Sequence, residues 1–275
     1  MTSSTRRTAV AALAALALSA GLSACGSDGA KPAAGSSATA STAAGGTATA
    51  KVSGTVTVFA AASLKESFTA LGKKFEAANP GVKVTFNFGG SSALAQSINS
   101  GAPADVFAAA SPATMKTVTD AKGATDPKVF VRNTLEIAVP KGNPKHIAAL
   151  KDLAGSGVKV ALCAQQVPCG AAAVTALKAG GVNLTPVTLE QDVKGALTKV
   201  ELGEVDASLV YRTDVKSDAA KIDGVDFPEA AKAVNDYPIA PLAKAPNAAG
   251  AAAFAAYILS PEAQALLTAA GFQAP

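Results

Sequence analysis

Apolar residues follow two different periods along the chain, and the first of them is the period of a strand. Residues 55–60 form a short run of β-branched and aromatic side chains, which predicts a β-strand. Leu64, Phe68, Leu71 and Phe75 then follow at i, i+4, i+7 and i+11, the spacing of one face of an amphipathic helix. The beginning of the pattern is therefore a strand that leads directly into a helix.

The same order recurs through most of the chain. Further strands are predicted near residues 82–88, 105–110, 159–162, 186–189 and 206–211. Further helices are predicted near residues 91–98, 112–121, 147–154, 170–179, 192–202, 247–259 and 261–270. Strands that are separated by helices indicate an α/β protein with parallel sheets and right-handed crossovers.

Two long extended stretches divide this pattern into blocks. They lie near residues 129–139 and 234–241, and we interpret them as strands that cross between two lobes. The predicted first lobe contains residues 53–133 and 237–275, so that the C-terminal helices return to it. The predicted second lobe contains residues 134–236.

The N-terminal segment has the pattern of an export signal. Arg6 and Arg7 precede an apolar run over residues 9–22, which is shorter than the about 20 apolar residues that span a bilayer. Leu-Ser-Ala-Cys at residues 22–25 is similar to a bacterial lipobox, after which the cysteine becomes the lipidated first residue. We therefore interpret residues 1–24 as a lipoprotein signal peptide and Cys25 as the lipidation site. The alternative is an ordinary signal peptide followed by a chance cysteine.

The segment after Cys25 has no side chain that starts a core. Residues 26–51 contain only Gly, Ser, Thr, Ala, Pro, Lys and Asp, a composition typical of a flexible coil. Residues 25–52 are thus predicted to be a lipidated cysteine and a tether that holds the folded part away from a membrane surface.

Charge and composition exclude several classes of function. The 275 residues carry a net charge of +4, but the leader contributes two and residues 25–51 one more, which leaves +1 for the rest. Such a balance argues against a nucleic-acid binder. With 49% apolar and 16% charged residues, the chain can bury a large core. His146 is its only histidine, which excludes zinc clusters and most histidine-based acid–base chemistry.

Small polar residues follow several of the predicted strands. These junctions are residues 60–63, 89–92, 167–170 and 192–193, and Tyr211 at the end of a strand. In open α/β sheets, ligands bind beyond the carboxyl ends of strands, where helix N-termini favour anions. None of the junctions offers an Arg or Lys. Hydroxyls and amides suit a fully ionised oxyanion and penalise a protonated one, whose proton finds no acceptor.

Each of these residues also has a purely structural interpretation. Ser63, with Glu66 three residues on, matches a capping box, and Ser91 is also placed to cap a helix. Tyr211 and Val193 are equally consistent with packing residues of the core, and Gly89-Gly90 with a simple turn.

Six fragments together resemble the periplasmic molybdate-binding proteins of ABC transporters. They occur in that family's order and spacing, and the resemblance covers about residues 53–275. The fragments are residues 58–64, 91–94, 101–107, 167–170, 190–197 and 209–211. The resemblance implies a two-lobed periplasmic-binding-protein fold of type II, with one oxyanion in the cleft between the lobes.

The resemblance also implies a set of ligand donors. The hydroxyls of Ser63, Ser91 and Tyr211 and the backbone amides of Cys169 and Val193 take the positions of the family's donors. Better-known members carry Ala at the position of Cys169. If the donor there is the main-chain amide, the identity of the side chain should matter little. The metal would enter only as part of the oxyanion, with no side chain coordinating it directly.

Two further cysteines remain once Cys25 is assigned to lipidation. Cys163 and Cys169 form an even pair in an oxidising compartment, which favours a disulfide over two free thiols or a metal pair. Such a disulfide would fix the loop that delivers the amide of Cys169. Asp105 and Asp206 are interpreted as residues that shape turns or cap helices, away from any ligand.

The resulting hypothesis is a carrier, and no enzyme. It is an extracytoplasmic lipoprotein, attached to the membrane only by its lipid, that binds molybdate and also tungstate for an ABC importer. It needs no cofactor, has the permease as partner, binds no nucleic acid and acts as a monomer. The alternatives are a carrier for another tetrahedral anion such as sulfate, a serine or cysteine hydrolase, and an adhesin or sensor.

Overall fold

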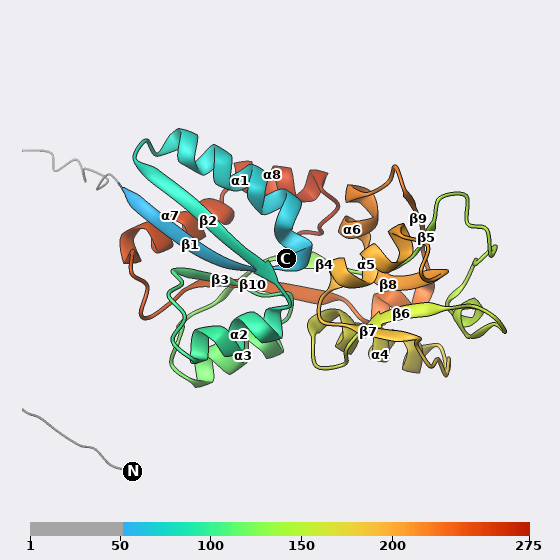
Figure 1. Ribbon diagram of the computed structural model, residues 1–275. Helices are drawn as coiled ribbons and strands as arrows, with labels where there is room; N and C mark the ends of the chain where they lie inside the picture. The colour runs from blue at the N-terminus through green and yellow to red at the C-terminus, as the bar shows by residue number, and fades with distance from the viewer. Residues whose placement is uncertain (1–51) are drawn as a thin grey trace, which may run out of the picture. The chain divides into compact units, whose positions relative to one another are not determined.

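The computed structural model describes residues 52–275, and these residues contain two five-stranded sheets flanked by helices (Figure 1). The predicted leader, Cys25 and the tether lie outside the described residues. The α/β prediction is confirmed. The first sheet has the strand order β2-β1-β3-β10-β4, and the second has the order β7-β6-β8-β5-β9.

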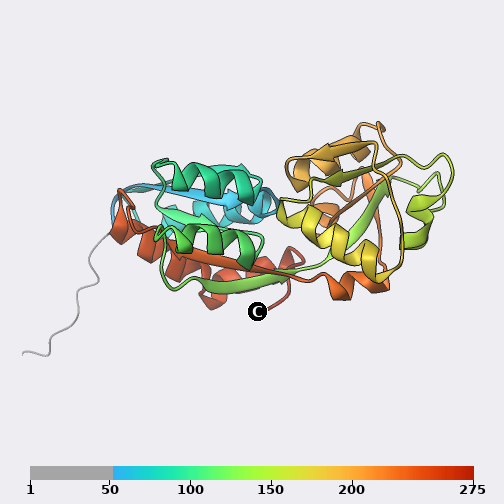
Figure 2. The same cartoon turned by 90° about the horizontal axis from the view of Figure 1, so that it is seen from below.

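The first sheet and its helices form what we call the first lobe. Its strands are β1 (Gly54–Ala61), β2 (Val82–Gly89), β3 (Val106–Ala108), β4 (Lys128–Asn133) and β10 (Asn235–Pro241). Its helices are the 3-10 turn η1 (Ala62–Leu64), α1 (Lys65–Ala78), α2 (Ser91–Asn99), α3 (Pro112–Asp120), α7 (Ala248–Ile258) and α8 (Pro261–Ala269). Helices α1, α7 and α8 cover one face of the sheet, and α2 and α3 cover the other (Figures 1 and 2).

The predicted apolar stripe explains how α1 packs on this sheet. Leu64, Phe68 and Leu71 are fully buried and Phe75 is 3% exposed. Phe68 and Phe75 contact Phe254 of α7 with ring centroids 6.1 and 5.3 Å apart. The helix ends before Pro80-Gly81, where the positive φ of Gly81 turns the chain into β2. The spacing of four apolar residues thus fixed which face of α1 meets the core.

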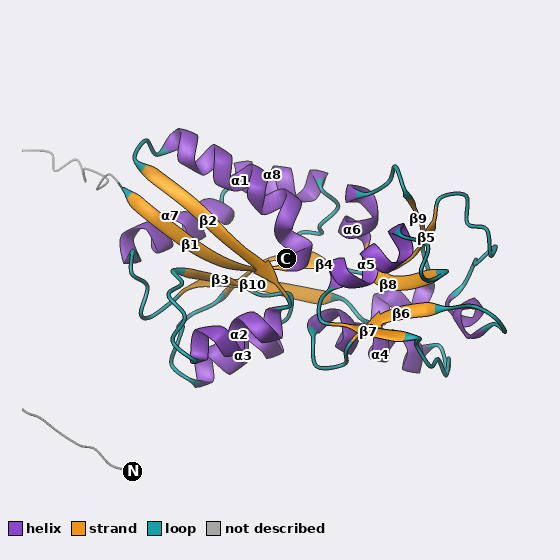
Figure 3. Ribbon diagram, in the orientation of Figure 1, coloured by secondary structure: helices purple, strands orange, loops and turns teal. Residues whose placement is uncertain are grey.

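The second sheet and its helices form the second lobe. Its strands are β5 (Leu135–Pro140), β6 (Val160–Cys163), β7 (Thr188–Glu190), β8 (Ala207–Tyr211) and β9 (Ile222–Val225). Its helices are η2 (Leu150–Ala154), α4 (Pro168–Ala179), α5 (Val193–Glu201), α6 (Arg212–Ser217) and η3 (Pro228–Lys232). Figure 3 shows this sheet between α4 on one side and α5 and α6 on the other.

The sheets are mixed rather than parallel, contrary to the expectation from the sequence. Strand β10 runs antiparallel to β3 and β4, and β5 runs antiparallel to β8 and β9. The predicted extended stretch at 129–139 is two strands that part at Thr134 and join different sheets. The chain returns to the first sheet where β10 begins. The exact lobe boundaries remain a prediction.

Other elements differ from the sequence pattern as well. The predicted helix over 147–154 is only the 3-10 turn η2, and α6, β9 and η3 were not predicted. In the described part of the chain, no helix combines the length and the apolar character that crossing a membrane requires.

Candidate functional site

A small pocket lies where the two lobes meet. It is lined by residues 61–63, 89–91, 167–169 and 192–193, together with Ala110 and Tyr211. Strands β1 and β2 deliver the first two segments, and the N-termini of α4 and α5 deliver the next two. All five residues that the sequence predicts as ligand donors (Ser63, Ser91, Cys169, Val193 and Tyr211) line this pocket.

The size of the pocket restricts what it can hold. The centre of a water-sized sphere can occupy about 20 Å³ of the pocket. A cavity that holds one water molecule offers about 10–15 Å³ to such a centre. The pocket therefore accommodates a compact ion rather than an organic metabolite.

Ser63 is not a helix cap. It lies in η1, and Leu64 is the N-cap of α1, so the predicted capping box is wrong. The Oγ of Ser63 forms a hydrogen bond of 2.9 Å with the phenolic oxygen of Tyr237. Both side chains are buried, with exposed fractions of 4% and 0%. Because Tyr237 lies on β10, the hydroxyl at the end of β1 is held by a residue from the far end of the chain.

Ser91 is held in a similar way. It is the first residue of α2, and its Oγ accepts a hydrogen bond of 3.0 Å from the backbone N–H of Ala110. The N-cap of α2 is Gly90, so Ser91 does not cap the helix either. Its hydroxyl is buried at the pocket, and its partner is a main-chain group next to β3.

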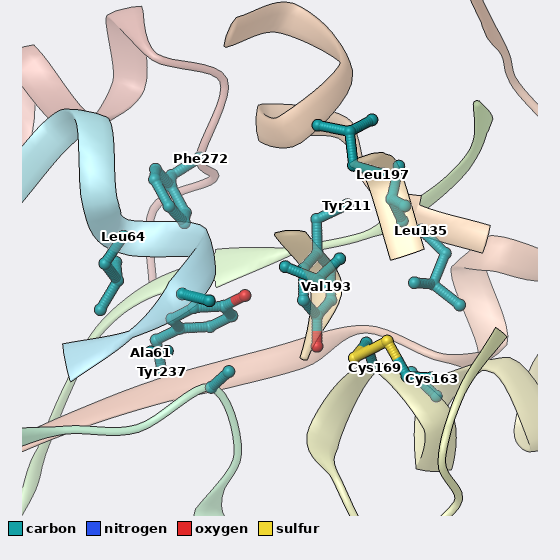
Figure 4. Packing of buried hydrophobic residues seen from close by; sticks show 14 of the residues in the cluster. Ala61, Leu64, Leu135, Cys163, Cys169, Val193, Leu197, Tyr211, Tyr237 and Phe272 are labelled. Carbon is teal, nitrogen blue, oxygen red and sulfur yellow. A yellow bond between two sulfur atoms is a disulfide. The ribbon is translucent and has the colours of Figure 1, made fainter. Parts of the chain in front are cut away.

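Tyr211 closes the pocket from the second lobe. It ends β8, is 1% exposed, and its phenolic oxygen accepts a hydrogen bond of 3.1 Å from Nδ2 of Asn235. Its ring contacts the ring of Tyr237 edge to face, with centroids 5.9 Å apart. Burial raises the pKa of Tyr211 well above its usual value, so its phenol keeps its proton. Figure 4 shows Tyr211 between Tyr237 and the disulfide.

Cys169 and Val193 line the pocket from the first turns of two helices. Cys169 follows Pro168, the first residue of α4, and Val193 is the first residue of α5. Amides of a first helical turn have no acceptor within their own helix. In α5 the Asp192 carboxylate accepts the N–H of Gly195 at 3.0 Å. The Val193 side chain is buried, as its interpretation as a packing residue expects, and the role of its amide as a ligand donor stays a prediction.

The loop before α4 is closed by a disulfide. Cys163, the last residue of β6, is bonded to Cys169, and their Cα atoms are 5.7 Å apart. A Cβ atom at Gly170 would overlap the carbonyl oxygen of Ala164. Glycine is required there because the loop backbone passes directly over the start of the helix.

The chain matches the family of bacterial extracellular solute-binding proteins over residues 56–273. The chain belongs to this family. Its sequence is 42% identical over 259 residues to the molybdate-binding protein ModA of Mycobacterium tuberculosis, covering 94% of this chain and 95% of that protein.

Two solved structures share the fold. The periplasmic molybdate-binding protein of Azotobacter vinelandii superposes with a TM-score of 0.70 at 21% identity, covering 80% of this chain and 99% of that one. The sulfate-binding protein SubI of Mycobacterium tuberculosis superposes with a TM-score of 0.68 at 20% identity, covering 80% and 86%. The predicted periplasmic-binding-protein architecture is thereby confirmed.

Polar contacts join the two lobes of this solute-binding protein beside the pocket. The Ser92 hydroxyl donates a hydrogen bond of 2.7 Å to the carbonyl oxygen of Gln166. A Cβ atom at Gly90 would overlap the carbonyl oxygen of Gln191, so glycine permits this close approach of the lobes. The pocket is therefore bordered by main-chain groups on both sides.

The pocket carries no positive side chain. Among the described residues that line it, Asp192 alone is charged, and its carboxylate caps α5. Lys194 lies outside the lining, 3.1 Å from Glu66 of the first lobe and 3.1 Å from Asp214 of the second. The Nζ of Lys194 and the Oδ1 of Asp214 form an ion pair, although their geometry is not that of a hydrogen bond. Burial raises the pKa of Asp214 to about 6, and Lys194 opposes that shift. Helix N-termini and hydroxyls are therefore the groups of this lining that favour an anion.

The other residues singled out in the sequence lie away from the pocket lining. Asp105 is buried and accepts the N–H groups of Thr57 and Asn247 at 2.7 and 2.6 Å, and Asp206 accepts the N–H of Lys159 at 2.8 Å. His146 is exposed. Within residues 52–275, no group of three or more His, Cys, Asp or Glu side chains is arranged to hold a metal ion.

Sequence reasoning missed Asn235 and Tyr237. Both lie on β10, and both hold a pocket hydroxyl. Their positions in an extended run gave no local signal of proximity to Ser63, which is 174 residues away from Tyr237 in the sequence.

Proposed function

We propose that this solute-binding protein captures molybdate outside the cytoplasmic membrane and delivers it to an ABC importer. The observation that carries the proposal is the 42% identity to a molybdate-binding protein across 95% of that protein's length. The pocket supports it independently, because a compact cavity lined by hydroxyls and helix N-termini suits a small, fully ionised oxyanion.

The proposed donors come from both lobes. Ser63 and Ser91 supply hydroxyls from the first lobe, and Tyr211, Cys169 and Val193 supply a hydroxyl and two backbone amides from the second. A hydrogen bond to a charged group contributes roughly 1.5–3 kcal/mol. Five such bonds, shielded from water, replace the hydration of the dianion. Tungstate has the same shape and charge, and we expect it to bind as well.

Ligand binding is proposed to stabilise the closed arrangement of the lobes, which the permease then recognises from their outer faces. The protein acts as a monomer in this scheme. Cys25 carries the lipid anchor and residues 25–52 are the tether, after removal of residues 1–24. The metal arrives only as part of the oxyanion, and no cofactor takes part.

Catalysis is not part of the proposal, and the geometry gives the reason. A nucleophilic serine needs a base within hydrogen-bond reach. The partner of Ser63 is the phenol of Tyr237; burial raises the pKa of Tyr237, so the phenol keeps its own proton and is not available to accept the proton of Ser63. Cys169 is bonded to Cys163, and the exposed His146 lies outside the pocket lining.

Sulfate is the alternative ligand, since a sulfate-binding protein has the same fold. Both ions are tetrahedral dianions, and cavity size decides between them. The identity to a molybdate-binding protein over nearly the whole chain favours molybdate.

The test is a titration of the purified protein with molybdate, tungstate, sulfate and phosphate, followed by calorimetry and thermal unfolding. A ligand at a thousandfold excess over its Kd stabilises the folded state by about 4 kcal/mol. We expect this effect for molybdate and tungstate, with sulfate and phosphate far weaker. Stabilisation by sulfate equal to that by molybdate would refute the molybdate assignment.

Membrane attachment is tested separately. Cys25→Ser should release the protein from the membrane fraction while leaving molybdate affinity unchanged. Retention of the variant in the membrane fraction would contradict a lipid anchor at Cys25.

A further inference from the structure

Each of the three pocket hydroxyls already makes one hydrogen bond to the protein. Ser91 is bonded to the backbone N–H of Ala110, Tyr211 to Nδ2 of Asn235, and Ser63 to the phenolic oxygen of Tyr237. A hydroxyl has a single proton. Whether it can give that proton to a ligand therefore depends on the direction of its internal bond.

Two of these directions are fixed by chemistry. A backbone N–H can only donate, so Ser91 accepts from Ala110 and keeps its own proton free. Asn235 also contacts the Ala110 carbonyl oxygen at 2.7 Å, and a carbonyl can only accept. The side-chain group of Asn235 that faces the Ala110 carbonyl must therefore be its NH₂. The second proton of this NH₂ is donated to the phenolic oxygen of Tyr211. Tyr211 consequently accepts internally as well.

The third bond is symmetric, because either Ser63 or Tyr237 can donate. If Ser63 donated to Tyr237, it would have no proton left for an anion. We propose that Tyr237 donates to Ser63, and that Asn235 and Tyr237 are positioning residues which turn the pocket hydroxyls into donors only. The raised pKa of the buried Tyr237 keeps its phenol protonated, which is consistent with this role.

The consequence is selectivity for anions without protons. A fully ionised oxyanion accepts every bond that the pocket offers. At the hydroxyls and amides, an anion of equal charge that carries one proton must place that proton against a donor. Asp192 is the one carboxylate among the described lining residues, and its Oδ1 accepts the N–H of Gly195 at the start of α5. This inference rests on the proposed function, because it names the class of anion that the same site selects.

The first test compares sulfate with hydrogen phosphate at about pH 8, where both are dianions of similar size and only phosphate has a proton. Calorimetry measures the Kd of molybdate, sulfate and phosphate for the wild type and for Tyr237→Phe. Without Tyr237 to orient it, the Ser63 oxygen is free to accept. We expect molybdate affinity to fall about tenfold and the sulfate-to-phosphate preference to fall by a similar factor, because only phosphate gains a partner for its proton.

Matched variants separate positioning from structure. Tyr257→Phe removes a buried hydroxyl that has no partner among the described residues, on α7, and should leave all affinities and their ratio unchanged. Asn235→Leu should shift the ratio in the same direction as Tyr237→Phe, through Tyr211. Equal weakening of all three anions in Tyr237→Phe, or no change, would overturn the inference.

A direct measurement decides the case even if sulfate and phosphate bind too weakly to titrate. Neutron diffraction on the deuterated molybdate complex should show the deuterium of Tyr237 on the line to Ser63. A deuterium directed from Ser63 to Tyr237 would refute the inference and leave the proposed function intact. Absence of molybdate binding to the wild type would instead refute the proposed function.

Discussion

The two lobes contribute to the pocket by different means. The first lobe supplies the side-chain hydroxyls of Ser63 and Ser91, each buried and held by an internal partner. The second lobe supplies mainly backbone, namely the first-turn amides of α4 and α5, with Tyr211 as its one hydroxyl. Side-chain identity should therefore matter in the first lobe, and the path of the main chain in the second.

This difference explains two features of the sequence. A cysteine at residue 169 is compatible with the proposed site, because the amide donor that we propose there does not depend on its own side chain. Glycine, in contrast, occurs where two segments of backbone lie too close together for a Cβ atom. The backbone of Gly170 lies against the Ala164 carbonyl within the second lobe, and the backbone of Gly90 lies against the Gln191 carbonyl of the other lobe.

Gly90→Ala should give the largest loss of binding. The φ of −60° at Gly90 suits any residue, so the variant should fold normally. Its Cβ would overlap the Gln191 carbonyl only when the lobes meet. We expect molybdate affinity to fall more than about 100-fold, which corresponds to about 3 kcal/mol. Calorimetry measures the loss, and small-angle scattering shows whether molybdate still closes the lobes.

Gly89→Ala is the comparison for that variant. Its Cβ would meet only Leu94, at an ordinary 3.8 Å. A loss as large as that of Gly90→Ala would mean that the close approach between the lobes is not the cause.

Ser63→Ala and Ser91→Ala should each weaken molybdate binding about 10- to 100-fold, because each removes a hydrogen bond to a charged ligand. Val193→Ala keeps its amide and should change affinity by less than about fivefold, although it loses buried packing. Kd values from calorimetry compare the three variants. If Val193→Ala weakens binding as much as Ser63→Ala, the contrast between side-chain and backbone donors is wrong.

The sequence predicted best what depends on local pattern. The apolar stripe from Leu64 to Phe75 packs as expected, and the polar residues at strand ends meet in one pocket. The carboxyl ends of neighbouring strands meet because the fold brings them to one edge, so residue type and place in a βα unit are sufficient to find them.

What the sequence did not predict depends on contacts between distant segments. Ser63 has the local signature of a capping residue, yet its partner is Tyr237, which no local rule brings near. The antiparallel course of β10 and the division of the extended stretch at Thr134 also depend on contacts between segments that are distant in the sequence. The alternation of residues along a strand is the same in either direction, so it does not distinguish a parallel from an antiparallel neighbour.

Replacing both Cys163 and Cys169 by Ala should affect stability more than binding. The disulfide closes a short loop, and its loss should cost about 2 kcal/mol. For a domain of this size, that lowers Tm by about 4–8 °C. Pro168 and Gly170 still direct the loop, so we expect molybdate affinity to fall less than about fivefold. Thermal unfolding and calorimetry measure the two effects, and reduction of the wild type should reproduce them.

A loss of binding above about 50-fold in the Cys-free variant would change this picture. It would mean that the disulfide, rather than the start of α4, holds the amide of Cys169 in position. The second lobe would then depend on side-chain identity as the first does.

Glu66→Gln should give the smallest effect, and it examines the contact between the lobes directly. Glu66 of the first lobe pairs with Lys194 of the second at 3.1 Å, and its side chain is 48% exposed. Exposed pairs contribute about 0.2–1 kcal/mol, so molybdate should dissociate at most about fivefold faster, with association unchanged. Stopped-flow measurements at low and high salt should show the difference shrinking as salt rises. Glu262→Gln, which breaks a comparable pair with Lys74 inside the first lobe, should leave the rate unchanged.

A small effect of Glu66→Gln beside a large effect of Ser63→Ala means that the ligand, and not attraction between the lobe surfaces, provides most of the energy of closure. A dissociation rate raised more than about 50-fold would reverse that conclusion and make the ion pair the main contact between the lobes.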